Sequence, residues 1–362
     1  MFAVILAGGA GTRLRPLTYA RRKELVPLLN RPLLEYRLLN LKQHGVRDIV
    51  LACSQGMREI EEHFGDGSAL GIRLHYSYED RPLGSGRAVK EAAAAAGATG
   101  TLVVCNGDIL TNVNLTAMIE QHRATGATLS ISLASVDDPW HFGVVAVDDD
   151  LRIRHFVEKP PQGEEPSNLI NGGTWLWEPA VLERIPGDES AVRDGFSERV
   201  LFPGVIDAGL RVQGFEEDLW VDVGSPERYL RATQLLLERT ARQLAEAVIV
   251  LEGADLAEDV EFVGHVLVAA GARIAPGARI VGPTVIGDRT TVGADADIVA
   301  SVIWEDVRIG AGASVTGCIL AAGVTIGDGA SLTDAVLGNG ASVAPNCTLD
   351  PGAKLMPDEQ VG

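Results

Sequence analysis

A short stretch near the amino terminus combines closely spaced glycines with several cations. It follows an apolar run and reads Leu6-Ala7-Gly8-Gly9-Ala10-Gly11-Thr12-Arg13. Glycine lets the backbone approach a polyphosphate closely, and successive N–H groups can then hold the phosphate oxygens. Arg13 and Lys23 add positive charge, and the glycine spacing matches neither the dinucleotide-binding motif nor the P-loop. The stretch therefore predicts a phosphate-binding loop of another kind.

Two aspartates follow predicted strands that are far apart in the chain. Asp108 ends the turn Cys105-Asn106-Gly107-Asp108, and Asp222 follows Trp220-Val221 ahead of a Gly-Ser-Pro turn. A single aspartate in a turn usually does no more than close that turn. Ligands of an α/β sheet bind at the carboxyl ends of its strands, however, and Mg²⁺ takes a few carboxylates together with substrate phosphates. The pair therefore predicts a magnesium site.

The elements that would position these residues alternate between strand and helix. We expect strands over 2–6, 48–52, 72–76, 102–105 and 129–133, and helices over 32–44, 57–64, 86–96 and 115–124. This order predicts an α/β domain with a Rossmann-like, mostly parallel sheet. Between 142 and 177 the predicted strands follow one another directly, which indicates an antiparallel addition. A helix over 226–246, with Ser225 as its N-cap, would connect this domain to the next.

From about residue 248 onward the apolar residues follow a different period. They recur every six positions at first and every 17 positions later, which no helix does. The registers are Ile274, Ile280, Ile286, Val292 and Ile298; Val292, Ile309, Ile326 and Val343; Ile298, Val315, Leu332 and Leu349; and Ile303, Leu320 and Leu337. A coil with three short flat faces repeats in this way, so the pattern predicts a parallel β-helix of hexapeptide repeats.

The two patterns define the expected domain organisation. We predict a catalytic domain over 1–232, a helical connector over 233–247 and the β-helix over 248–362. A solenoid has open ends and long flat faces, and we therefore expect a homo-oligomer formed through the β-helix.

Composition limits the class of protein. The chain has 362 residues, of which 46% are hydrophobic, and its net charge is −18. That charge argues against nucleic acid as a partner, although a few local cations can still bind a small anion. The apolar stretches are too short for a membrane span, and the amino terminus lacks the basic region of a signal peptide. We therefore expect a cytoplasmic protein that binds no membrane.

The order of the motifs resembles that of the NDP-sugar pyrophosphorylases, which are sugar-1-phosphate nucleotidyltransferases. The resemblance covers essentially the whole chain and rests on LAGGAGTRLRPLT, KELVPLLNRPLLEY, EDRPLG, NGD, FVEKP, NGG and WVDVG. Within that family it is nearest to the mannose-1-phosphate guanylyltransferases, and many members carry a left-handed β-helix. Arg22 and Glu24 depart from the family pattern, where prolines are common, but Lys23 stays in register.

The resemblance implies a role for each matching residue. Arg13 and Lys23 would hold the triphosphate, and Asp108 and Asp222 would bind Mg²⁺; these four form the implied catalytic set. The implied nucleotide-binding residues are Leu6, Ala7, Gly8, Gly9, Gly11, Thr12, Arg13, Glu79, Pro82, Gly84 and Ser85. The implied sugar-phosphate residues are Gly143, Glu158, Lys159, Asn171 and Gly172. Because the attacking group is an ionised phosphate, positioning and charge neutralisation suffice, and we expect no histidine to act as a base.

Glu79 bears on the choice of base. Family members that use UTP or dTTP commonly carry glutamine there, and an amide both donates and accepts hydrogen bonds. A carboxylate only accepts, which suits the N1–H and N2 amine of guanine. We therefore expect GTP and mannose 1-phosphate as substrates, with UTP or dTTP and glucose 1-phosphate as the alternative. A pairing of Glu79 with Arg81 would leave the base undecided.

Two other classes of function also share these folds. A non-catalytic regulatory subunit would lack the catalytic cations or aspartates, all of which are present here. An acyltransferase with a hexapeptide β-helix generally needs a histidine base, and this β-helix carries only His265. Both are therefore less favoured than the nucleotidyltransferase.

Overall fold

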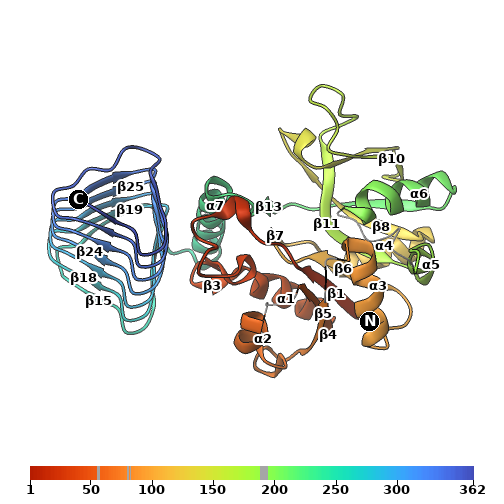
Figure 1. The fold of residues 1–362 in the computed structure, drawn as a ribbon, viewed down its shortest axis with the longest axis horizontal. Coiled ribbons are helices and arrows are strands. Elements are labelled where there is room, and N and C mark those ends of the chain that lie inside the picture. Colours follow the sequence, from red (N-terminus) through yellow and green to blue (C-terminus); the bar gives the residue numbers. More distant parts are fainter. Residues whose placement is uncertain (55–57, 80, 82, 188–194) are drawn as a thin grey trace. The chain divides into compact units, whose positions relative to one another are not determined.

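The computed structural model describes residues 1–54, 58–79, 81, 83–187 and 195–362 (Figure 1). Contacts group the chain into two compact units. The first comprises Met1–Gly9 and Leu34–Val221, and the second comprises Ala10–Leu33 and Asp222–Gly362. The glycine-rich loop is thus divided between the units. The domain boundaries expected from the sequence, at 232 and 248, stay a prediction.

A mixed sheet forms the centre of the first unit. Its strand order is β10-β9-β11-β6-β1-β4-β5, with β8 joining β11 and β12. The strands are β1 Phe2–Ala7, β4 Asp48–Ser54, β5 Arg73–Glu79, β6 Leu102–Asn106, β8 Leu129–Ser135, β9 Gly143–Val147, β10 Ile153–Glu158, β11 Leu169–Trp177 and β12 Val212–Glu216. β6, β1, β4 and β5 are parallel, whereas β11 runs antiparallel to β6, β8 and β9.

The expectation of a Rossmann-like α/β sheet is therefore confirmed, but its mostly parallel character holds only for one half. Parallel neighbours need a long crossover, usually a helix, whereas antiparallel neighbours do not. The chain from β8 to β11 contains no α-helix in the structure, and the antiparallel addition expected between 142 and 177 is found there.

The expected helices form within a residue or two of their predicted limits. The α-helices of the first unit are α1 Leu33–Gln43, α2 Arg58–Phe64, α3 Ser85–Ala95, α4 Leu115–Thr125, α5 Pro179–Glu183 and α6 Phe202–Asp207. α4 begins after Asn114, whose side chain accepts a hydrogen bond from the Ala117 amide, and it ends at Gly126 with φ +62°. α3 contributes Ala88, Val89, Ala92 and Ala93 to the core, which also contains Trp175, Trp177 and Phe202.

Short elements complete the ribbon in Figure 1. They are η1 Thr12–Leu14, η2 Lys23–Leu25, β2 Pro27–Leu28, β3 Arg31–Pro32, η3 Ser68–Leu70, β7 Ile109–Thr111, η4 Pro139–His141, the π-helix η6 Ser197–Leu201 and β13 Trp220–Asp222. The long helix α7, Pro226–Leu244, has Ser225 as its N-cap, as expected, and Ala245 as its C-cap. Among the described residues, no helix has the length and hydropathy to cross a bilayer.

Three parallel sheets form the β-helix of the second unit. The first contains β14 Val248–Val250, β17 Val266–Val268, β20 Thr284–Ile286, β23 Val302–Ile303, β26 Ile319–Leu320, β29 Val336–Leu337 and β31 Lys354–Leu355. The second contains β15 Asp255–Leu256, β18 Arg273–Ile274, β21 Thr291–Val292, β24 Arg308–Ile309, β27 Thr325–Ile326, β30 Ser342–Val343 and β32 Gln360–Val361. The third contains β16 Glu261–Val263, β19 Arg279–Val281, β22 Asp297–Val299, β25 Ser314–Thr316 and β28 Ser331–Thr333.

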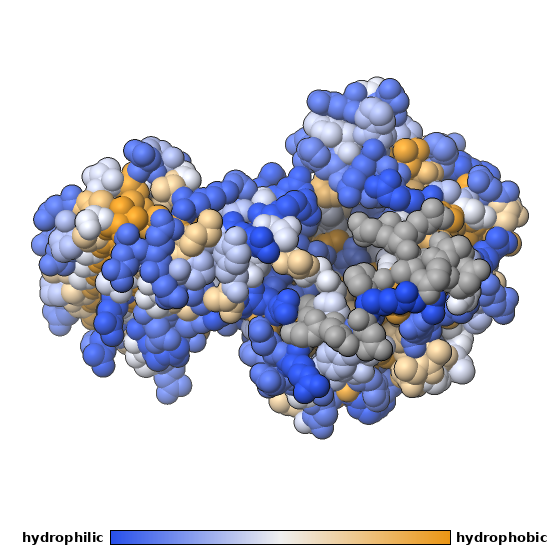
Figure 2. All heavy atoms as spheres, in the orientation of Figure 1, coloured by the Kyte–Doolittle hydropathy of each residue, from blue (hydrophilic) through white to orange (hydrophobic). Residues whose placement is uncertain are grey.

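The apolar registers read from the sequence stack inside this β-helix. Val292 pairs with Ile309, which pairs with Ile326, which pairs with Val343. The period changes from 18 to 17 at the corner before β23, because Val281 pairs with Val299, 18 residues further on, whereas Val285 pairs with Val302, 17 residues further on. The face drawn in Figure 2 is largely hydrophilic, as expected for a charge of −18.

Polar side chains close one corner of successive coils. The amide of Ser301 donates to Thr284 Oγ1 over 3.3 Å, the amide of Cys318 donates to Ser301 Oγ over 3.0 Å, and the amide of Ala335 donates to Cys318 Sγ over 3.4 Å. Side chains thus supply acceptors to amides in the interior. All four cysteines are free thiols, and Cys318 acts as one of these corner acceptors.

Replacing Ser301 with alanine should destabilise the β-helix. Ser301 is fully buried, and its loss would leave the Cys318 amide without its acceptor, at a cost of about 1–3 kcal/mol in free energy of unfolding. Calorimetry of Ser301→Ala and of Ser314→Ala, a half-buried serine on β25, measures the difference in Tm. Equal shifts in the two variants would contradict this account of the corner.

Candidate active site

The carboxyl ends of four parallel strands meet at one edge of the sheet in the first unit. β1 ends at Ala7, where Leu6 pairs with Ala52 on one side and with Asn106 on the other. Gly8 and Gly9 follow and are exposed. A Cβ on Gly8 would approach no atom closer than 4.0 Å, and one on Gly9 would have no neighbour within 4 Å. The loop is therefore open to a ligand at the edge where the sequence places it.

The Asp108 turn packs directly against the end of β1. The amide of Gly107 donates to the carbonyl of Leu6 over 2.9 Å. A Cβ on Gly107 would lie 3.1 Å from that same carbonyl oxygen, so the position favours glycine. The half-buried Asp108 is thereby held beside the strand that leads into the glycine-rich loop.

The loop Asn171-Gly172-Gly173 lies against the same turn. Gly173 has φ +75°, and a Cβ there would meet Ile109 Cδ1 at 2.5 Å and Asn106 Nδ2 at 2.9 Å. The side-chain oxygen of Asn171 accepts hydrogen bonds from the Gly173 amide and from Trp175 Nε1. That oxygen fixes the loop itself, so a contact of Asn171 with a ligand would fall to its amide nitrogen.

Two aromatic residues connect this loop with the FVEKP motif. Trp220 Nε1 donates to the carbonyl of Gly172 over 3.0 Å, and its ring is perpendicular to that of Phe142 at 5.1 Å. The amide of Lys159 donates to the carbonyl of Phe142 over 2.9 Å. Trp220 and Phe142 were not among the residues expected from the sequence, although Trp220 stands in the WVDVG motif that supplied Asp222.

Gly143, Glu158 and Lys159 lie together, as the resemblance implied. Glu158 pairs with Gly143 across β10 and β9, and a Cβ on Gly143 would lie 2.9 Å from Glu158 Oε2. Lys159 Nζ is 3.4 Å from Glu158 Oε1, with the lysine side chain 59% exposed and the glutamate side chain 13% exposed. Lys159 has φ +51°, a sparsely populated conformation for a residue with a side chain and one that is frequent at binding sites.

A buried polar network lies behind Gly172 and was not foreseen. Glu217 Oε2 accepts a hydrogen bond from Thr111 Oγ1, and a Cβ on Gly172 would overlap Glu217 Oε1. Burial raises the pKa of Glu217 to about 7, against the lowering effect of Thr111 and the positive charge of Arg37. Arg37 is 2% exposed and donates to Thr174 Oγ1 over 2.9 Å.

Two nitrogens of this network, Arg37 Nε and Arg37 Nη2, have no hydrogen-bond partner among the described residues, whereas Glu217 also forms a side-chain hydrogen bond with Ser132. Little in the sequence indicates this network. Glu217 stands within the acidic run 216–218, which is typical of an exposed surface, and Arg37 lies in an otherwise ordinary amphipathic helix.

Glu79 is the last residue of β5, and Ser85 is the first residue of α3. Glu79 Oε2 accepts a hydrogen bond from the Leu83 amide over 3.0 Å, and burial raises the pKa of Glu79. Gly84, with φ +76°, precedes α3. Ser85 Oγ donates to Glu198 Oε2 over 3.2 Å and accepts from the Ser197 amide. Pro82, also expected at this site, lies outside the described residues.

The second unit contains the rest of the opening loop. Gly11 has φ +60°, its carbonyl accepts a hydrogen bond from Thr18 Oγ1, and a Cβ there would lie 3.3 Å from Lys23 Cβ. Thr12 and Arg13 follow in η1 and are exposed. The loop therefore folds back so that Gly11 approaches Lys23.

Lys23 and Asp222 lie together in this unit. The Lys23 side chain is 6% exposed, and its Nζ is 3.9 Å from Asp222 Oδ1. Arg228, on the first turn of α7, donates to Asp222 Oδ2 over 2.9 Å and was not expected from the sequence. The structure thus brings Lys23 and Asp222 together, and their roles stay a prediction.

The donor set fits a hard divalent cation. Asp108 and Asp222 each offer carboxylate oxygens, which Mg²⁺ prefers. Within the part of the chain that the structure describes, no group of three or more His, Cys, Asp or Glu side chains gathers. Magnesium sites in nucleotide enzymes commonly use one or two carboxylates plus substrate phosphates, so the carboxylate of each aspartate is by itself a suitable ligand.

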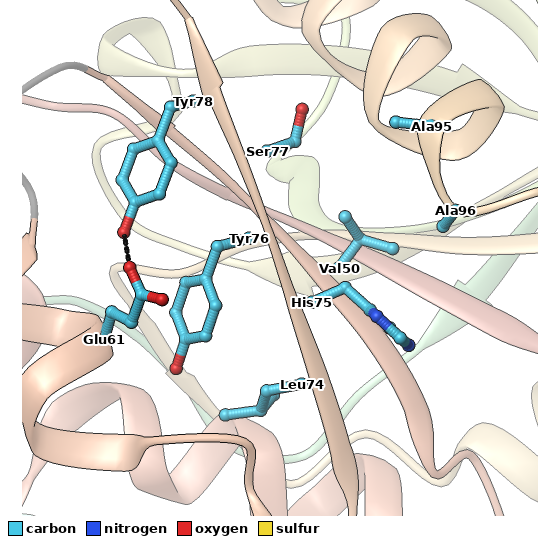
Figure 3. Close-up of a pocket in the computed structure, with 9 residues that line it drawn as sticks. All are labelled: Val50, Glu61, Leu74, His75, Tyr76, Ser77, Tyr78, Ala95 and Ala96. Atoms are coloured by element: carbon cyan, nitrogen blue, oxygen red, sulfur yellow. Dashed lines mark hydrogen bonds between the residues drawn. The ribbon is translucent and has the colours of Figure 1, made fainter.

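A separate pocket lies around the edge strand β5 and holds none of the expected site residues (Figure 3). It has a volume of about 340 Å³ and is lined by Val50, Glu61, Leu74, His75, Tyr76, Ser77, Tyr78, Ala95 and Ala96. Tyr78 Oη donates to Glu61 Oε2 over 2.6 Å, and the rings of Tyr76 and Tyr78 stack at 6.4 Å. The side-chain hydroxyl and carboxylate are thus engaged with each other.

Comparison with known proteins matches both parts of the chain. The family described as "Nucleotidyl transferase" matches residues 2–239, and the "EIF2B subunit epsilon LbH domain" matches residues 244–362. The second match agrees with the parallel β-helix expected from the hexapeptide repeats and with the left-handed form that the family resemblance implied.

Several characterised relatives are similar over most of their length. A mannose-1-phosphate guanylyltransferase of Mycobacterium tuberculosis is 34% identical, over 84% of this chain and 80% of the relative. A UTP–glucose-1-phosphate uridylyltransferase of Synechocystis is 33% identical, over 84% and 83%. A crystal structure from Bacillus anthracis, assigned as a glucose-1-phosphate thymidylyltransferase, is 25% identical with a TM-score of 0.59, over 65% of this chain and 95% of that chain.

The extent of these matches and the order of the motifs in the site lead to one conclusion: this chain belongs to the nucleotidyl transferase family, among the NDP-sugar pyrophosphorylases.

Proposed function

We propose that this protein transfers a nucleotidyl group from a nucleoside triphosphate to a sugar 1-phosphate, which yields an NDP-sugar and pyrophosphate. The observation that carries the proposal is the buried Lys23 beside Asp222, because a desolvated ammonium next to an acidic metal ligand suits a polyphosphate. Lys23 belongs to the opening motif of the family, and the glycine-rich loop that precedes it is open at Gly8 and Gly9.

The chemistry follows from the charges of the two substrates. An oxygen of the sugar phosphate attacks the α-phosphorus of the triphosphate, and pyrophosphate leaves in line. Two anions must approach each other, so positioning and neutralisation are the protein's task. Arg13 and Lys23 bind the triphosphate, Lys159 binds the sugar phosphate, and Glu158 and Asn171 orient the sugar hydroxyls.

Two aspartates complete the proposed machinery. When bound, Mg²⁺ would supply positive charge to the phosphate oxygens, and Asp108 and Asp222 are the residues that would hold it. No proton needs to be removed from an ionised phosphate, so no histidine takes part.

GTP and mannose 1-phosphate are our preferred substrates. Relatives named for guanylyl and for uridylyl transfer match this chain with nearly equal identity, so the base must be argued from the site. The Leu83 amide orients the carboxyl group of Glu79, which offers only acceptors when ionised. Guanine presents two adjacent donors, N1–H and the N2 amine, whereas O4 of uracil or thymine would meet a carboxylate oxygen.

Asp108→Asn should abolish most pyrophosphate release. Loss of the carboxylate charge weakens metal binding, and we expect a fall in kcat on the order of 100-fold or more. The assay crosses GTP, dTTP, UTP and ATP with mannose and glucose 1-phosphates in the presence of Mg²⁺. The exposed Asp149→Asn serves as the matched control and should behave as wild type. Wild-type protein that releases no pyrophosphate with any pair would refute the proposed function.

Glu79→Gln should shift the choice of base from GTP toward UTP and dTTP. The amide keeps the size of the side chain but supplies a donor for O4, so the ratio of kcat/KM values should move by about tenfold or more. The measurement compares GTP with UTP at a fixed concentration of sugar 1-phosphate, with the exposed Glu59→Gln as control. An unchanged ratio would exclude Glu79 as the residue that reads the base.

We also propose a cytoplasmic homo-oligomer that associates through the β-helix. β14, β15 and β16 each begin a sheet, and exposed Val250 and Val263 lie on these end strands. Open strand edges with exposed apolar residues favour association. Light scattering of the purified protein should give more than one chain per particle, and Val250→Lys should reduce that mass; a monomer at assay concentration would contradict the proposal.

A further inference from the structure

The region that contains Lys23 forms one compact unit with the β-helix. Residues 10–33 group with residues 222–362, which include α7 and all coils of the solenoid. The contacts between them involve buried and partly buried side chains. They lie on both sides of Lys23 in the sequence, at Arg21 and at Pro27–Leu29.

A hydrogen-bonded chain on one side runs from the β-helix to the backbone of β2. Trp304 follows β23, and its Nε1 donates to Tyr229 Oη over 2.8 Å. Tyr229 Oη in turn donates to the carbonyl of Pro27 over 2.6 Å. Trp304 is 1% exposed and Tyr229 is fully buried, so neither group can exchange its partner for water. Leu29, two residues after Pro27, packs against an apolar cluster that includes Leu237 of α7 and Leu267 of the β-helix.

A charged contact holds the other side. Arg21 forms an ion pair with Glu305, and its guanidinium lies 4.9 Å from the centre of the Trp304 ring. Both side chains of the ion pair are about one-quarter exposed, so the pair alone would contribute little. Stacking on the buried Trp304 gives the guanidinium a fixed platform in addition.

Lys23 lies between these two attachments. It is two residues after Arg21 and four before Pro27, and it begins η2. Its buried side chain reaches Asp222, four residues before the start of α7, the helix that carries Tyr229. Trp304 contacts both sides of this arrangement, through Arg21 and through Tyr229.

We propose that Trp304 and Glu305 of the β-helix are positioning residues for Lys23. They touch no substrate, and they act by fixing the segment 21–28 and α7 so that Lys23 Nζ meets the triphosphate beside Asp222. The proposal rests on the proposed function for the role of Lys23, while the coupling itself rests on the contacts above. The β-helix is then part of the phosphate-binding half of the site.

The test uses the full-length protein with Trp304→Phe, which keeps an aromatic ring beneath Arg21 but removes the part of the indole that carries the Nε1–H donor. Misplacement of Lys23 should lower kcat about tenfold or more and raise the KM for the triphosphate. The KM for the sugar 1-phosphate should stay within about twofold, because Glu158 and Lys159 belong to the other compact unit. Backbone amides of residues 22–28 should exchange hydrogen faster than in wild type.

Glu305 is tested by exchanging the charges of the Arg21–Glu305 pair, with its neighbour Asp306 as the matched control. Arg21→Glu should reduce kcat, and the double variant Arg21→Glu with Glu305→Arg should recover most of that loss. Asp306 pairs with Arg289 over 2.7 Å on the surface of the same coil and does not belong to the Trp304 contacts. Asp306→Asn should therefore leave kcat, both KM values and the exchange of residues 22–28 unchanged.

Three results would overturn the proposal. The first is unchanged turnover in Trp304→Phe, and the second is a loss of turnover that Asp306→Asn shares. The third is a rise in the sugar-phosphate KM equal to that for the triphosphate, which would indicate general destabilisation. If wild-type protein proves inactive with every substrate pair, the proposed function fails, and hydrogen exchange at 22–28 still decides the coupling: no change in Trp304→Phe refutes it.

Discussion

The burial of an ammonium group constrains the centre of this protein. Lys23 is almost fully enclosed, and removal of a charge from water costs several kcal/mol unless an opposite charge lies close by. Asp222 supplies that charge from the segment that leads into α7, and Arg228 on α7 holds the other oxygen of the same carboxylate. The Lys23–Asp222 pair therefore forms only when the N-cap of α7, the opening loop and the apolar contacts of α7 are all in place. A chain with net charge −18 thus places two cations, Lys23 and Arg228, against a single carboxylate.

Much of the fold follows from local sequence patterns. The alternation of apolar runs and amphipathic stretches located α1, α3, α4 and α7 to within about two residues, and the apolar registers identified the stacked positions of the β-helix. Both signals are short-range, because each depends on a fixed repeat of the backbone. The mixed character of the sheet does not follow from such local patterns. Which strands become neighbours is decided by long-range pairing, such as that of β11 with β6, which no local period records.

The residues of the candidate site also fall into those that local sequence indicates and those that depend on long-range packing. Motif order pointed to the open glycines, the Asp108 turn and the Glu158–Lys159 pair, because glycine and charged residues at strand ends suggest their chemistry by residue type alone. Glu217, Arg37 and Trp220 were missed. An acidic run and an amphipathic helix normally indicate solvent, so burial of Glu217 and Arg37 is visible only once the strands around Gly172 have assembled. Asn171 was expected as a sugar-binding residue. That its side-chain oxygen holds its own loop could not be foreseen, because this depends on the position of the Trp175 side chain four residues further along β11.

The uniform coil of the β-helix has a consequence for how such a protein can change its length. Each coil pairs only with the coil before and the coil after it, so a whole coil can be added or removed without altering the cross-section of the others. Trp304, however, follows the fourth strand of its sheet, and the coils that precede it set its height along the axis. Insertion or deletion of repeats during evolution is therefore expected to be tolerated toward the carboxyl terminus. It is expected to be selected against in the first coils, because their number sets the position of Trp304 along the axis of the β-helix.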